Sequence, residues 1–368
     1  NSPGYYFFNG NSWGSVSGSI AGGWALIGNS GTNPTTNFIG TSDNQPIRFR
    51  LNNLWAGELN VASNNILLGD SSGVSTTSGT LNTSLGSKSL KLNETGLGNT
   101  AIGSYALNRN LISNTTAVGS YALQNNTYGT TNSAFGYSAL RLNTIGSYNT
   151  AIGYESSRQN LDGNGNTGLG YQALYWNTAS FNTAIGTNSL AFNSTGQNNT
   201  GVGMNALYNN TSGSNNTSVG YYALGTNTTS TFNTAVGSFA LAYNTGANNT
   251  AVGGYALTNS TGSNNTSMGV FAMYENTSGY YNAAVGYEAL RNMQNGYGNV
   301  SFGPGTLRSI TYSENNTAMG ASALYNCTDG HRNTAVGSGV AYSTSLGLNN
   351  TAVGYNALSG NINGDQNI

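Results

Sequence analysis

Residues whose side chains could do chemistry are few in this chain and stand far apart. Only 6% of the 368 residues are charged. Catalysis by paired carboxylates needs two acids brought close together. The acidic residues are instead scattered: Asp43, Glu58, Asp70, Glu94, Glu155, Asp162, Glu275, Glu288, Glu314, Asp329 and Asp365. The sequence therefore gives no catalytic residue, and we expect that the protein is not an enzyme.

The only histidine, His331, stands beside Arg332, with Cys327 and Asp329 just before it. A Cys/Asp/His group could hold a metal or supply a nucleophile, but this spacing matches no zinc pattern. We favour a solvated turn at this place. We expect neither a metal site nor a cofactor.

The residue types of this chain also argue against phosphate-binding and calcium-binding sites. Phosphate-binding glycine loops need a strand followed by a helix, and no helical periodicity follows the glycines of this chain. Calcium-binding β-rolls use a regularly spaced Asp, where this chain has Asn and Thr. The formal net charge of -1 and the lack of a long apolar run favour neither nucleic acid nor membrane insertion.

The element that must position every side chain is a short repeat, NTAIGSYAL at residues 99–107, with close copies along the chain. A fixed short period predicts a solenoid, in which each coil stacks on its neighbours around a continuous core. The glycine of the repeat recurs at intervals of sixteen or seventeen residues, as Gly69, Gly86, Gly103, Gly119, Gly136, Gly153, Gly170, Gly186, Gly203, Gly220, Gly237, Gly253, Gly269, Gly286, Gly303, Gly320, Gly337 and Gly354.

An asparagine stands four places before most of these glycines, and Thr115 interrupts the series. Stacked Asn side chains can hydrogen-bond from coil to coil through their amides. We therefore predict a structural ladder that includes Asn99, Asn149, Asn199, Asn249, Asn299 and Asn350.

Two apolar positions recur in each repeat: the residue just before the glycine, such as Ile102, and the leucine four places after it, such as Leu107. We expect two short strands and two turns per coil, with these two positions forming the core. Because side chains alternate along a strand, Thr100 shares the core face and Ala101 points outward. The outward position stays small throughout, as does Ala106, which suggests close approach by another chain. We infer side-by-side packing of several chains along these alanines, as a trimer.

Aromatic residues follow many of the glycines by one or two places. Half-exposed rings could stack on sugars or hold on to a surface, whereas packing between coils would only stiffen the rod. The candidate surface aromatic ladder consists of Tyr105, Tyr121, Tyr137, Tyr154, Tyr171 and Tyr255.

Residues 1–60 differ in composition from the repeat array at residues 61–368 and hold three of the four tryptophans, Trp13, Trp24 and Trp55. The stretch 37–53 predicts a β-hairpin with a turn from Ser42 to Pro46. A cap of this kind would cover the apolar end of the first coil. We expect an N-terminal β cap or attachment segment followed by the solenoid.

The NTAIGSYAL phrase resembles the N-S-V-A-I-G repeats in the heads of YadA-like trimeric autotransporter adhesins. It is also similar to longer repeats in phage-type tail-fibre proteins, where a segment like NFIGTSDNQPIRFRLNN precedes the array. The resemblance implies a homotrimeric parallel β-roll exposed at a cell or virion surface. The repeat is longer than in the adhesins, and Thr replaces their inward Val.

The sequence therefore predicts an all-β protein, a parallel β-solenoid that forms a non-enzymatic extracellular structural or adhesive fibre. Its expected partners are its own copies, as a homotrimer or longer filament, and a cell-surface glycan or protein receptor. Two alternatives remain open. One is an ice- or surface-binding solenoid, which needs its Thr and Asn arrays to face outward. The other is a glycan-degrading fibre, which needs a carboxylate pair.

Overall fold

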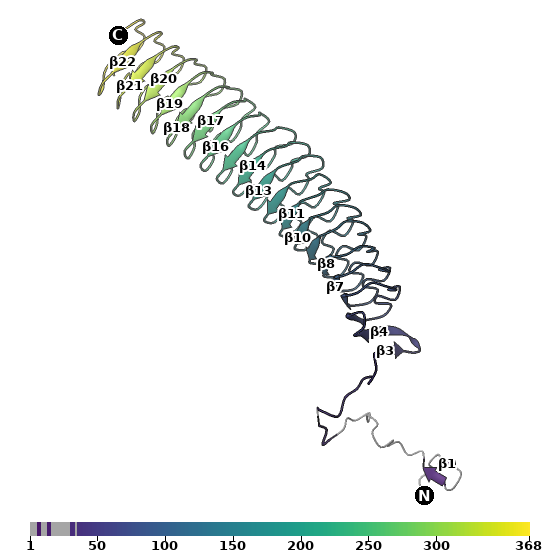
Figure 1. The fold of residues 1–368 in the computed structure, drawn as a ribbon. Helices are drawn as coiled ribbons and strands as arrows, with labels where there is room; N and C mark the ends of the chain where they lie inside the picture. Colours follow the sequence, from purple (N-terminus) through teal and green to yellow (C-terminus); the bar gives the residue numbers. More distant parts are fainter. Residues whose placement is uncertain (1–5, 9–12, 16–29, 34) are drawn as a thin grey trace.

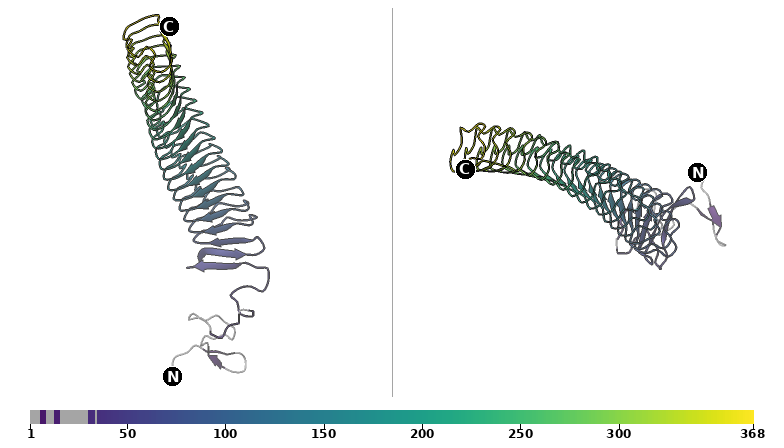
Figure 2. Two further views of the ribbon diagram at one scale, coloured as in Figure 1. Left: turned by 90° about the vertical axis from the view of Figure 1, so that its left-hand side faces the viewer. Right: turned by 90° about the horizontal axis from the view of Figure 1, so that it is seen from above.

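The repeat forms a long stack of coils with no layered globular core. The computed structural model describes residues 6–8, 13–15, 30–33 and 35–368. From residue 65 onward the coils stack in sequence order into a gently curved rod that runs to the C-terminus (Figures 1 and 2). With a rise of about 4.8 Å per coil, the stack from Gly69 to Gly354 is roughly 80 Å long.

Each coil contributes one short strand, which pairs in parallel with the strands of the coils before and after it. The described part of the chain contains strands and turns but no helix, and so no helix that could cross a membrane. The prediction of an all-β parallel solenoid is confirmed. The solenoid strands are β5 (Asn65–Leu68), β6 (Thr83–Leu85), β7 (Thr100–Ile102), β8 (Thr116–Val118), β9 (Ser133–Phe135), β10 (Thr150–Ile152), β11 (Thr167–Leu169), β12 (Thr183–Ile185), β13 (Thr200–Val202), β14 (Thr217–Val219), β15 (Thr234–Val236), β16 (Thr250–Val252), β17 (Thr266–Met268), β18 (Ala283–Val285), β19 (Val300–Phe302), β20 (Thr317–Met319), β21 (Thr334–Val336) and β22 (Thr351–Val353).

The strands before the array pair antiparallel. β3 (Ile47–Leu51) and β4 (Leu54–Asn60) form a hairpin, and β4 also pairs antiparallel with β5. The hairpin thus extends the solenoid sheet at its first strand (Figure 1). A separate pair, β1 (Tyr6–Phe8) with β2 (Trp13–Ser15), includes Trp13, whereas Trp24 lies outside the described residues.

The sequence predicted a hairpin at residues 37–53, whereas the observed hairpin consists of β3 and β4 and so lies one strand further along the chain. Residues 37–41 form no strand, and the turn lies at Asn52 and Asn53, with φ of 50° and 60°. Positive φ at both central residues is typical of the tight turn that joins two strands, and asparagine tolerates it. The polar segment before Pro46 suggested the hairpin turn, but the turn is formed by Asn52 and Asn53.

The two faces of each solenoid strand are opposite to the prediction. The middle residue, such as Ala101 or Ala184, is fully buried, whereas the apolar residue before the glycine, such as Ile102 or Ile185, is more than one-third exposed. Threonine shares the outer face and is half-buried in most coils. Alternation along the strand is as expected, but alanine points inward. The inferred outward alanine face is therefore wrong.

The interior of the coil is too narrow for larger side chains at this inward position. In the coil that contains Gly168, an added Cβ would lie 2.6 Å from the Ser156 Oγ, and at Gly201 it would lie 2.6 Å from the Ser189 Oγ. These two serines stand where most coils have alanine, three places after the repeat glycine. In these two coils a serine on one wall is thus matched by a glycine opposite. Ala106 and the equivalent alanines are buried for the same reason, except Ala357 in the last coil, which is partly buried.

The second side of the coil is a run of turns, so the prediction of two strands per coil is wrong. Tyr105 and Leu107 both have positive φ, 60° and 48°, and the equivalent residues of the other coils repeat this. Backbone hydrogen bonds still join the coils here, for example from Leu107 N to Ala122 O at 3.0 Å. Leu107 and the equivalent leucines are buried in all coils but the last, where Leu358 is partly buried, which confirms the leucine position as core.

The repeat glycine is required because successive glycines stack backbone on backbone. Gly103 has φ of 126°, and a Cβ there would lie 2.6 Å from the carbonyl carbon and oxygen of Gly119. Any side chain would push adjacent coils apart. This contact explains why the glycine recurs in every coil.

We predict that Ala235→Leu destabilises the array strongly, whereas the neighbouring Val236→Leu does not. Ala235 is fully buried between the two walls of its coil, and overpacking of a core costs about 1–3 kcal/mol. Val236 points outward and is 37% exposed. Thermal unfolding followed by circular dichroism measures both variants. An equal fall in melting temperature for the two would contradict this assignment of the faces.

Candidate functional site

The asparagines of the predicted ladder are hydrogen-bonded from coil to coil except at Thr115, and their main partner is the backbone. The Asn199 Oδ1 accepts the backbone N–H of Asn216 at 3.0 Å, and its Nδ2 donates to the Gly213 carbonyl at 2.8 Å. The same two bonds recur along the array, and all six predicted members are buried. Both bonds of Asn199 therefore reach the next coil, because Gly213 stands three places before Asn216.

A second asparagine ladder, seven places after the repeat glycine, was missed. Here the amides bond to one another, as from Asn143 Nδ2 to Asn126 Oδ1 at 2.7 Å and from Asn210 Nδ2 to Asn193 Oδ1 at 2.6 Å. Its period was visible in the sequence as a second register of asparagine. The buried members are Asn93, Asn110, Asn126, Asn143, Asn160, Asn177, Asn193, Asn210, Asn227, Asn244 and Asn276.

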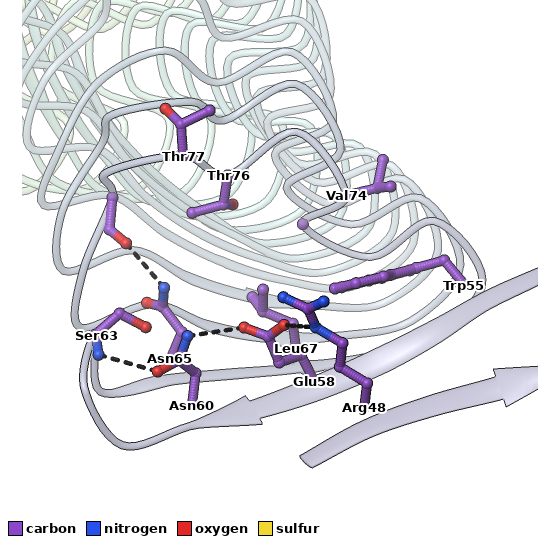
Figure 3. A pocket seen from close by; sticks show the side chains of 12 residues that line it. Arg48, Trp55, Glu58, Asn60, Ser63, Asn65, Leu67, Val74, Thr76 and Thr77 are labelled. Atoms are coloured by element: carbon purple, nitrogen blue, oxygen red, sulfur yellow. Dashed lines mark hydrogen bonds and ion pairs between the residues drawn. The ribbon is translucent and has the colours of Figure 1, made fainter. Parts of the chain in front are cut away.

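A cavity of about 320 Å³ lies between the hairpin and the first coil (Figure 3). Arg48, Trp55 and Glu58 contribute to its wall from the hairpin, Ser63 from the turn before β5, and Thr76 from the first coil. None of these was predicted as a site residue. The residues that line the cavity come from separate segments of the chain, which meet only in the folded protein. No local sequence pattern therefore indicated the cavity.

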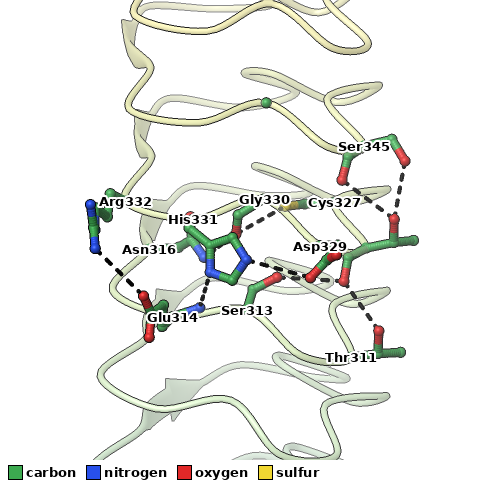
Figure 4. Close-up of polar contacts among 12 residues, drawn as sticks. Thr311, Ser313, Glu314, Asn316, Cys327, Asp329, Gly330, His331, Arg332 and Ser345 are labelled. Carbon is green, nitrogen blue, oxygen red and sulfur yellow. Dashed lines mark hydrogen bonds and ion pairs between the residues drawn. The ribbon is translucent and has the colours of Figure 1, made fainter.

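The Cys/Asp/His group does not form a reactive centre (Figure 4). The His331 Nδ1 accepts the backbone N–H of Glu314 at 3.3 Å, and its Nε2 lies 3.4 Å from the Asp329 Oδ1. Both ring nitrogens are thus engaged by neighbours within the chain. Among the residues that the structure describes, no three His, Cys, Asp or Glu side chains gather as metal ligands would.

Cys327 points away from this group into the interior. It is fully buried, and it stands in the column that the second asparagine ladder occupies in earlier coils. Burial raises the pKa of the Cys327 thiol to about 11. The thiol is therefore a core residue and not a nucleophile.

The predicted aromatic ladder consists of two separate groups. Tyr137, Tyr154 and Tyr171 stack with ring centroids 5.3 and 5.4 Å apart and planes within 15°. Tyr105 and Tyr121 continue this group, while Tyr255 stacks in a second group between Phe239 and Phe271. Polar residues and Met204 interrupt the series between them.

The stacking restricts what these rings can bind. A sugar packs against the face of an aromatic ring, but in this ladder the faces of the inner rings are covered by neighbouring rings. At the end of the first group the Lys88 Nζ lies 5.0 Å from the Tyr105 centroid and donates a hydrogen bond to its hydroxyl. The arrangement favours stiffening of the rod over sugar stacking.

The outer face of the strands runs along the whole array, and on it a row of apolar side chains lies beside a row that is threonine in most coils. In the strands from β6 to β22 no residue is charged. Side chains of adjacent coils flank each apolar residue, yet most remain between 37% and 69% exposed. We call this surface the Thr/apolar face. Its exposed apolar members are Leu85, Ile102, Phe135, Ile152, Leu169, Ile185, Val219, Val236, Met268, Phe302, Met319 and Val353.

No family model matches this chain, and no curated protein matches it. Arguments about function therefore rest on the surfaces described above.

We predict that Asn199→Ala selectively speeds hydrogen exchange at the backbone amide of Asn216. The substitution removes the only side-chain acceptor of that N–H and leaves it buried, which costs about 1–3 kcal/mol. Amide exchange followed by mass spectrometry measures protection in this coil. Asn198→Gly, at the exposed neighbouring residue with φ of 57°, is the control and should leave it protected. Unchanged protection in Asn199→Ala would contradict the role of the ladder.

We predict that Cys327 does not react with a thiol reagent in the folded protein at pH 8. The raised pKa keeps the thiol protonated at this pH, and the interior excludes the reagent. Reaction with dithionitrobenzoate, followed by absorbance, should begin only when denaturant unfolds the array. Rapid reaction of the native protein would show that Cys327 is exposed and its thiolate populated.

Proposed function

We propose that the protein is a non-enzymatic structural and adhesive fibre, an extracellular homotrimer whose chains pack side by side through the Thr/apolar face. The observation that carries the proposal is the uninterrupted, uncharged apolar row on this face. Exposed apolar patches of this extent are rare on monomers and mark interaction surfaces. The alanine positions that first suggested lateral packing are interior, so the interface moves to the opposite side of the strand.

The size of the face fits a stable self-association. Three strand residues at about 3.3 Å each give a width of roughly 10 Å. Over the roughly 80 Å of the stack this amounts to about 800 Å² per chain, the area that one partner buries in a standard interface, and in a trimer two neighbours would share it. A second copy of the chain has the same coil spacing, so its apolar row would match this one coil by coil.

The resemblance to adhesin heads and tail fibres favours three chains and a location at a cell or virion surface. In such a fibre the hairpin β3–β4 would cap the apolar end of each first coil. Repeated weak contacts with a glycan or protein receptor along the rod would add up through avidity.

We predict that Ile185→Lys dissociates the trimer without unfolding the coils. A lysine at the centre of the Thr/apolar face would place an unpaired charge in the interface, which costs several kcal/mol per chain. Native mass spectrometry should show three times the chain mass for the parent protein and a smaller species for Ile185→Lys. Thr195→Lys, at an exposed turn position of the same repeat, should leave the mass unchanged. A parent protein that is monomeric at micromolar concentration would refute the proposal.

A second candidate, an ice- or surface-binding solenoid, is favoured by one observation. The threonines lie on the outer face of the strands, as this function requires, and not on the core face as the sequence predicted. Two features oppose it. The rod is curved (Figure 2), and bulky residues such as Phe135 and Phe302 interrupt the regular surface. Both would limit the match to a planar lattice.

Thermal hysteresis distinguishes the two candidates. We expect the purified protein to give no freezing-point depression beyond its colligative effect, because the Thr/apolar face is covered in the fibre. Measurable hysteresis that Thr200→Lys abolishes would establish ice binding and displace the fibre proposal.

A further inference from the structure

The cavity between the hairpin and the first coil holds polar groups that the chain leaves unsatisfied. The Ser63 Oγ and the Thr76 Oγ1 are both buried and have no hydrogen-bond partner, and both residues line the cavity. Buried hydroxyls without partners are unusual in folded proteins. Each can donate and accept, so together they suit a ligand whose groups do the same, such as an alcohol.

The charges in the cavity balance each other. Glu58 is nearly buried, and its carboxylate accepts hydrogen bonds from the Arg48 Nε at 2.8 Å and from the Asn60 Nδ2 at 2.9 Å (Figure 3). The carboxylate keeps further lone pairs for a ligand, and the Arg48 side chain is 57% exposed. An ion pair of this kind offers neither net charge for an anion nor the several oxygen ligands that a cation requires. A neutral ligand fits best.

Trp55 supplies a fixed aromatic wall. Its indole N–H donates to the Ser72 carbonyl at 2.8 Å, which holds the ring in place beside the Arg48 guanidinium (Figure 3). Because the indole N–H is already used, the ring offers mainly apolar surface. A site with one flat apolar wall and several hydroxyl, amide and carboxylate groups has the chemistry that a sugar ring requires.

Thr76, which lines the cavity, differs from the residue that most coils have at the equivalent position. It stands seven places after Gly69, in the column that is asparagine in most later coils. Thr344 occupies the same column near the other end of the rod, and its Oγ1 is also buried without a partner. Thr344 is absent from the lining of the cavity. The pair therefore provides a matched control: the same residue in the same register, with and without a cavity.

We propose that this cavity binds a neutral saccharide of one or two rings. Its volume of about 320 Å³ lies at the lower end of the range for small-molecule sites, which suits such a ligand. Hydroxyl groups of the sugar would pair with the Ser63 and Thr76 hydroxyls and the Glu58 carboxylate, and its C–H face would pack on Trp55. The inference does not depend on the proposed trimer, because the cavity belongs to a single chain.

Calorimetric titration of the full chain with neutral sugars tests the proposal. The probes are the methyl glycosides of glucose, galactose, mannose and N-acetylglucosamine, with lactose and maltose. Sialic acid and inorganic phosphate serve as charged comparisons. We expect millimolar or tighter binding of at least one neutral probe and none of the charged ones. The absence of binding by every neutral probe, or equal binding of phosphate, would overturn the proposal.

Three variants locate the binding site. Thr76→Val keeps the shape of the side chain and removes the unpartnered hydroxyl, and we expect affinity to fall about tenfold. Glu58→Gln should weaken binding at least as much, with an unchanged melting temperature showing that the hairpin is intact. Thr344→Val should bind as the parent does. If Thr76→Val binds normally, or if Thr344→Val weakens binding equally, the sugar lies elsewhere and the proposal fails.

Discussion

The structure depends on the narrowness of each coil, whose two walls meet across small side chains, mostly alanine or serine, at two positions and mostly leucine at a third. Ala184, for instance, faces inward from its strand, and Gly201 leaves room for Ser189 of the preceding repeat. So thin an interior can bury little apolar surface per coil. The remaining cohesion comes from hydrogen bonds between coils, through the strands, the turns and two columns of asparagine.

This constraint also determines what lies outside. Since the inward position admits only small residues, the larger side chains of each strand must face outward, and the result is the Thr/apolar face. A row of this length is a liability for a solitary molecule, because it invites association. Self-association would bury it along its whole length, whereas residues such as Arg332 and Glu314 remain at the turns in contact with solvent. The narrow interior of each coil thus determines the outer surface through which the chains are proposed to assemble.

Much of the architecture was predictable because it follows from period and residue type. The glycine register gave the solenoid, the asparagine register gave a ladder, and the leucine column gave part of the core. The faces of the strand were not predictable in the same way. Alternation shows that Ala101 and Ile102 point in opposite directions, but only the distance to the opposite wall shows which points inward. Positive φ at Tyr105 and Leu107 has no signature in those residue types, so the second side was mistaken for a strand. The cavity could not be predicted, because Glu58 and Thr76 approach only after the hairpin folds onto the first coil.

The most direct test of the central claim measures distances between chains. A nitroxide label on Val219→Cys, in a Cys327→Ala background, reports on the Thr/apolar face, and a label on Thr195→Cys reports on a turn away from it. Because each chain carries one label, pulsed dipolar spectroscopy measures only distances between labels on different chains. We expect strong coupling at short distance for position 219 and weaker coupling at longer distance for position 195. No coupling at either position, or the shorter distance at position 195, would contradict the claim that this face joins the chains.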